Sequence, residues 1–96
     1  MKEREFQKQL ISEIKQRFPG CIVLKNDPTY IQGVPDLTIF YKDKWATLEV
    51  KACRDANIQP NQLYFVKKMN EMSFSKFVSP ENKEVILNEL QQAFRS

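Results

Sequence analysis

The fold is decided by residues 36–51, which read DLTIFYKDKWATLEVK. Two apolar, β-prone runs flank a short polar link, which is the pattern of a β-hairpin. Because side chains alternate along a strand, Glu49 and Lys51 point to the same face of the second run. A turn centred on Lys42-Asp43 sets Asp36 directly opposite Glu49, whereas a slip of one residue would separate the two carboxylates.

The opposed carboxylates indicate a site for a hard divalent cation. Cross-strand neighbours have Cβ atoms roughly 5 Å apart, which suits two carboxylates that share one ion. Buried charge must be paired or bound to a cation, and oxygen ligands favour Mg²⁺ or Mn²⁺ over zinc. The chain has no His, and Cys21 and Cys53 lack the spacing of a zinc site.

Lys51 has two interpretations. Beside a bound metal it could orient or deprotonate a water, or offset charge that develops on a phosphate. Alternatively, Glu49 and Lys51 form an ordinary ion pair on a surface hairpin, which is the usual meaning of an isolated Glu-x-Lys. The Pro35-Asp36 pair at hairpin distance favours the catalytic interpretation.

Length, charge and hydropathy bound the number of domains and the kinds of partner that the chain could have. A length of 96 residues predicts one small domain, residues 1–96. The formal charge of +3 permits nucleic-acid binding without requiring it, and Lys25 and Arg54 flank the predicted strands either as phosphate contacts or as solvated side chains. The chain shows no secretory leader and no run of membrane-spanning length, so we expect a cytoplasmic protein that does not contact a membrane.

Residues 3–18 are predicted to form an amphipathic helix, because apolar side chains recur there at helical spacing. Glu3 and Gln7 fall within the apolar stripe, whereas Glu5 lies almost opposite it. Two explanations of Glu3 stand side by side. Acidic residues are favoured in the first turn of a helix, and Glu3 could instead deliver a third carboxylate to the metal site.

The remaining elements follow from turn residues and apolar runs. Strands are expected at 21–26 and 74–79, in addition to the two strands of the hairpin. A helix is expected from Pro60 to about Met72, and a last helix is expected to begin at Pro80 and to bury its apolar side, including Val85. The order predicts an α/β fold.

The loop at 27–34 leads directly into Pro35-Asp36, so Tyr30 and Gln32 are expected at the mouth of the site. Gly33 supplies either a turn with positive φ or a close approach of the backbone to a ligand. Gln62 lies in the opening turn of the helix at 60–72. Its amide either contacts the site or is solvated.

The order and spacing of these motifs resemble the PD-(D/E)XK nuclease superfamily, and more narrowly the stand-alone phage type of VRR-NUC domain, which is related to Holliday junction resolvases. The matching residues are Glu3, Gln7, 33–36, 49–51, Gln62 and the tail at 77–81. This resemblance implies a restriction endonuclease-like αβββαβ core, with a mixed four-stranded sheet flanked by helices and an added C-terminal helix.

The resemblance also implies roles for individual residues. Asp36, Glu49 and the backbone carbonyl of Val50 would hold Mg²⁺ or Mn²⁺, and Glu3 would complete the acidic shell. Lys51 would be the catalytic lysine, and Gln62 would belong to the same catalytic set. Apart from these implied roles, contacts to DNA are expected from Gln7, from Tyr30 and Gln32 in the loop, and from Lys25 and Arg54 beside the strands.

The implied activity is a metal-dependent endodeoxyribonuclease that hydrolyses phosphodiester bonds in branched DNA such as Holliday junctions, encoded by a phage or prophage and working in the host cytoplasm. Two paired incisions would require a homodimer, for which Tyr64, Phe65 and Met72 are spare apolar residues unless they are core. The alternatives are a non-catalytic nucleic-acid-binding module and a non-specific or nicking nuclease. A sequence-specific restriction-type enzyme usually requires a longer chain.

Overall fold

The computed structural model describes residues 1–95. Four strands form one mixed sheet in the order β1-β2-β3-β4, with antiparallel β1–β2 and β2–β3 pairs and a parallel β3–β4 pair. The elements are α1 (Glu3–Arg17), β1 (Ile22–Lys25), β2 (Leu37–Tyr41), β3 (Lys44–Val50), α2 (Pro60–Met72), β4 (Ser75–Val78) and α3 (Lys83–Arg95). This order confirms the expected α/β fold. None of the helices in residues 1–95 is long and apolar enough to cross a membrane.

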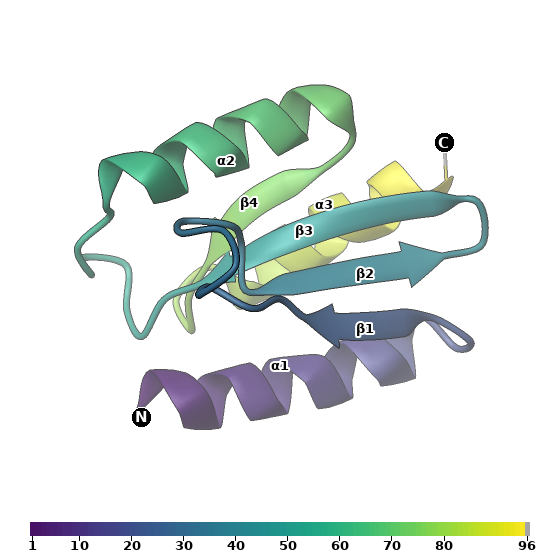
Figure 1. Cartoon of the computed structure of the whole chain (residues 1–96). Helices are drawn as coiled ribbons and strands as arrows, with labels where there is room; N and C mark the ends of the chain where they lie inside the picture. Colours follow the sequence, from purple (N-terminus) through teal and green to yellow (C-terminus); the bar gives the residue numbers. More distant parts are fainter. Residues whose placement is uncertain (96) are drawn as a thin grey trace.

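Helices cover the sheet on both sides (Figure 1). α1 and α3 pack on one face, and α2 packs over β3 and β4 on the other. Most of the core lies between the sheet and the pair α1 and α3, where each buried Leu or Ile contributes roughly 1.5–3 kcal/mol. Its most deeply buried side chains include Leu10, Ile14, Leu37, Ile39, Leu48, Val50, Leu87 and Leu90.

The β2–β3 hairpin has the predicted register. Its Cα partners run from Tyr41 with Lys44 to Leu37 with Leu48, so the next pair along is Asp36 with Glu49. The two-residue turn places Lys42 at φ 58°, a left-handed conformation suited to tight hairpins. The register sets both carboxylates at the same end of the sheet.

β3 is buried on both faces from Ala46 onward because the sheet continues through it into β4. The parallel β3–β4 pair requires a crossover, which α2 supplies. The backbone N–H of Lys51 donates to Val78 O at 2.8 Å and extends the pairing past the end of β3. The crossover brings the first turn of α2 beside the last residues of β3.

Two predictions at the C-terminal end were wrong. The last helix begins at Lys83 rather than Pro80, because the Asn82 side chain accepts the Ser79 N–H at 2.8 Å and donates to Phe77 O at 3.2 Å, which holds a turn there. Val85 is exposed instead of packing with the core. Buried positions of α3 start one residue later, at Ile86.

Candidate functional site

Asp36 and Glu49 lie side by side where β2 begins and β3 ends. Asp36 Oδ2 accepts the backbone N–H of Val50 at 2.8 Å, which fixes its carboxylate against the end of β3. Glu49 is only 4% exposed. The hairpin therefore brings two carboxylates together at the edge of the core, as the sequence predicts.

Asn26 anchors the approach to Asp36. Its side-chain amide donates to Pro35 O and to Thr38 Oγ1, both at 2.8 Å, and its backbone N–H donates to Asp36 O at 2.8 Å. Asn26 was not predicted to belong to the site. Its position one residue beyond β1, where the β1–β2 register continues to Asp36, is the signal that would have found it.

Lys51 points along the same face as Glu49. Its ammonium lies 3.7 Å from Glu49 Oε2 and donates to Gln62 Oε1 at 2.8 Å and to Asn57 O at 2.9 Å. Only 11% of its side chain is exposed. Because an ammonium has three N–H groups, these three partners hold the cation in one place.

Gln62 connects the two charged residues. Its Nε2 donates to Glu49 Oε2 at 2.9 Å, while its Oε1 accepts from Lys51 and also from the Gln59 N–H at 2.9 Å. The last bond satisfies one of the free N–H groups at the start of α2. Of the two interpretations of Gln62, the structure supports contact with the site.

The other carboxylate oxygen of Glu49 has no such partner. Among residues 1–95, Glu49 Oε1 is a buried side-chain oxygen without a hydrogen-bond donor. Burial, followed by the negative charge of Asp36, raises the pKa of Glu49 to about 8, although Lys51 opposes the shift. A buried acceptor without a donor next to a second carboxylate is costly unless a cation or a proton lies between them.

This donor set fits Mg²⁺ or Mn²⁺. Within residues 1–95, no three Asp, Glu, His or Cys side chains gather closely enough to hold a metal ion, so Asp36 and Glu49 are the side-chain ligands available. Mg²⁺ commonly binds through one or two carboxylates and keeps several waters. A site with two carboxylates agrees with this mode of binding.

Glu3 does not lie with Asp36 and Glu49. It is exposed in the first turn of α1, which packs on the opposite sheet face through Phe6 and Leu10. The start of α1 lies at the same end of the sheet as the carboxylates (Figure 1). The structure does not bring Glu3 to the pair, and its role as a third ligand stays a prediction.

The raised pKa of Glu49 predicts a pH-dependent stability in the absence of metal. Between its ordinary value of 4.5 and about 8, the carboxyl is protonated in the folded protein and ionised in the unfolded chain. Stability is therefore highest below pH 4.5 with respect to this group and falls as pH rises to about 8. Thermal unfolding in EDTA should show this decline in the wild type and a weaker decline in Glu49→Gln.

Glu89→Gln, which removes an exposed carboxylate on α3, serves as the control and should keep the wild-type slope. Equal slopes in wild type and Glu49→Gln would assign the decline to other groups.

The predicted DNA-contacting residues are exposed or half-buried. Tyr30 is 84% exposed, Lys25 and Arg54 are exposed, and Gln7 is half-buried on α1. Gln32 lines a cavity of about 450 Å³ between the loop at 27–34 and the start of α2. Its lining also includes Gly33, Gln59, Asn61 and Gln62. The loop therefore lies beside the site, and the DNA contacts themselves stay predictions.

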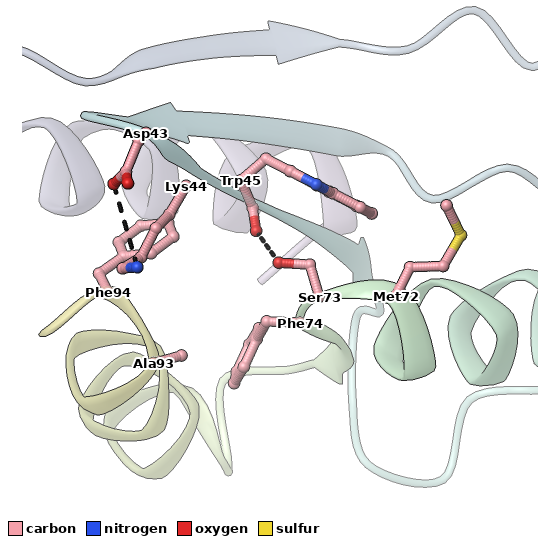
Figure 2. A pocket seen from close by; sticks show the side chains of 8 residues that line it. All are labelled: Asp43, Lys44, Trp45, Met72, Ser73, Phe74, Ala93 and Phe94. Atoms are coloured by element: carbon pink, nitrogen blue, oxygen red, sulfur yellow. Dashed lines mark hydrogen bonds and ion pairs between the residues drawn. The ribbon is translucent and has the colours of Figure 1, made fainter. Parts of the chain in front are cut away.

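A second cavity, of about 400 Å³, lies at the other end of β3 (Figure 2). It is lined by Asp43, Lys44, Trp45, Met72, Ser73, Phe74, Ala93 and Phe94. None of the candidate site residues contributes to it. The chemistry is therefore expected at the carboxylate end of the sheet.

No protein-family model matches the chain, and no curated protein matches its sequence. The geometry around Asp36, Glu49, Lys51 and Gln62 is accordingly the ground for a functional proposal.

Proposed function

We propose that this protein is an endodeoxyribonuclease that uses Mg²⁺ or Mn²⁺ to hydrolyse phosphodiester bonds. The observation that carries the proposal is the buried Glu49 Oε1, which has no donor in residues 1–95 and belongs to a carboxylate whose cross-strand neighbour is a second carboxylate, Asp36. Lys51 lies on the same face and is held by neutral partners. Two carboxylates and one fixed cation are the groups that metal-assisted phosphoryl chemistry uses.

The residues of the chain have separate tasks. Asp36, Glu49 and the Val50 carbonyl hold the metal, which when bound supplies Lewis-acid polarisation of the phosphate and activation of the attacking water. The Val50 N–H orients Asp36, and Gln62 orients Glu49 through its Nε2. Lys51 keeps a positive charge beside Glu49, where it offsets the charge that develops on the phosphate.

Several finer assignments belong to the same proposal. The αβββαβ order with α3 added supports a restriction endonuclease-like fold and membership of the PD-(D/E)XK superfamily, in the phage type of VRR-NUC domain. Branched DNA such as a Holliday junction is the proposed substrate. Because a chain with one such site makes one incision, two copies related by a two-fold axis would make the paired cuts.

The test is a cleavage panel. Purified protein is incubated with labelled four-way junction, flap, duplex and single-stranded DNA, each with Mg²⁺, Mn²⁺ or EDTA. We expect cleavage of branched substrates with either ion and none in EDTA. Binding of DNA without cleavage under every condition would instead identify a non-catalytic nucleic-acid-binding module.

A further inference from the structure

Half of one sheet face is left open. α2 packs over β3 and β4, and none of the helices in residues 1–95 covers β1 and β2 on that side (Figure 1). Three apolar side chains are exposed there: Ile22 by 59%, Leu24 by 47% and Phe40 by 41%. Contiguous exposed apolar surface of this kind commonly marks a binding site.

The exposed residues form an ordered row. Ile22 is the Cα partner of Phe40, which is the partner of Trp45, and directly opposed residues point to the same face. The Trp45 indole extends toward Met72 at the end of α2 and away from Phe94 (Figure 2). We call Ile22, Leu24, Phe40 and Trp45 the platform.

The platform is on the same face as the carboxylates. Thr38 lies between Phe40 and Asp36 along β2, and side chains two residues apart share a face. Phe40 follows Asp36 by four positions of extended chain, a length of about 13 Å. That span equals about four stacked nucleotides at 3.4 Å each.

The strands that carry the platform hold no acidic side chain. β1 and β2 contain no Asp or Glu, and the whole chain carries +3. Lys25 and Lys42 belong to the opposite sheet face, because Lys25 pairs with the core residue Leu37 and the Lys42 ammonium lies over the Tyr41 ring. A flat apolar surface with an aromatic ring and without acidic neighbours on its strands binds base faces by stacking.

We propose that the platform stacks unpaired nucleobases of the DNA strand that enters the carboxylate site. This inference rests on the proposed nuclease function and specifies its substrate as DNA with single-stranded nucleotides beside the cleaved bond, such as a flap or an open junction. Uninterrupted duplex presents phosphates and groove edges rather than base faces, so it cannot use Phe40 in this way. The cut is expected within about four nucleotides of the stacked base.

Trp45 provides a direct readout because it is the only Trp in the chain and belongs to the platform. Its fluorescence is followed while single-stranded oligo-dT or a blunt hairpin duplex is added in EDTA, where cleavage is blocked. We expect oligo-dT to quench the emission and the blunt duplex to leave it nearly unchanged. The cleavage assay with Mg²⁺ should show the same preference for flap over blunt duplex.

Phe40→Leu is the main variant because leucine keeps apolar surface but removes the ring. Oligo-dT should bind this variant about five-fold or more weakly, as expected for the loss of one stacked base. Ile22→Thr, which keeps a β-branched residue on β1, should weaken binding less. Val85→Ala, which shortens an apolar side chain of α3 that is 56% exposed, should bind like the wild type.

The outcomes separate the two proposals. If oligo-dT quenches the Trp45 emission but no metal ion supports cleavage, the stacking proposal stands and the nuclease proposal fails. If flap and blunt duplex are cleaved at equal rates, the stacking proposal fails and the nuclease proposal stands. The same conclusion follows if Phe40→Leu binds oligo-dT with unchanged affinity. A dimer that dissociates in Phe40→Leu, with oligo-dT binding unchanged, also overturns it, because the platform is then an interface between copies.

Discussion

Asp36→Asn is expected to abolish metal-dependent cleavage while the protein remains folded. Asparagine keeps an oxygen that can accept the Val50 N–H, but it removes one of the two charges that would hold the cation. The rate should fall by at least about 10²–10³-fold, the usual loss when one charge-stabilising group leaves an active site. Cleavage of labelled four-way junction with Mg²⁺ measures the effect.

The same change should stabilise the metal-free protein. The negative charge of Asp36 is one of the causes that raise the pKa of Glu49, so its removal relieves repulsion between the two carboxylates. Thermal unfolding in EDTA should therefore occur at a higher temperature in Asp36→Asn, and added Mg²⁺ should stabilise only the wild type. A variant that cleaves normally would refute the assignment of Asp36.

Two further variants complete this experiment. Asp43→Asn changes an exposed carboxylate in the hairpin turn and should behave like the wild type. Lys51→Ala should also lose cleavage, because it removes the cation beside Glu49. Folding of Lys51→Ala is verified by circular dichroism before its activity is compared.

Gly33→Ala is expected to destabilise the protein by roughly 2–4 kcal/mol. Gly33 has φ +89°, where a side chain is strained, and a Cβ at this position would lie 2.7 Å from Asn61 Cβ and 2.8 Å from its backbone carbonyl carbon. Relief requires the loop at 27–34 or the start of α2 to move. Because Gln62 follows Asn61, that movement should also weaken cleavage.

Gly20→Ala is a matched control for backbone strain. Gly20 has the same φ of +89°, but within the described chain nothing lies within 4 Å of an added Cβ. We expect a loss of about 1 kcal/mol from the left-handed conformation alone. Chemical denaturation measures the free energy of unfolding of both variants, and the difference between them isolates the contact between Gly33 and α2. Equal losses of unfolding free energy would show that this contact contributes nothing.

The hairpin and its carboxylates could be predicted from the sequence because their geometry is local. Alternation fixes the faces of β2 and β3, and a two-residue turn at Lys42-Asp43 fixes the pairing of Asp36 with Glu49. The helix at Pro60–Met72 was also predicted with these bounds, since Pro60 marks its first residue. Local rules of this kind do not require knowledge of the tertiary structure.

Other features depend on contacts between distant segments and could not be predicted in this way. The Asn57 carbonyl binds Lys51 only because the chain after β3 folds back, and backbone carbonyls carry no signal in a sequence. Asn82 delays α3 through bonds to Phe77 and Ser79, which compete with helix formation from Pro80. Helical spacing puts Glu3 within the apolar stripe of α1, yet its side chain is exposed, and spacing alone does not say where along the sheet the helix begins.

The bond from the Lys51 ammonium to the Asn57 carbonyl closes a ring of backbone and side chain between β3 and α2. The length of the segment between Lys51 and Asn57 therefore determines whether this hydrogen bond can form. Inserting residues between 52 and 56 would detach the lysine from its carbonyl without disturbing any strand. By contrast, a peptide tag or a fluorophore should be accommodated at the far tip of the hairpin, beside Asp43, where the chain reverses direction in open solvent.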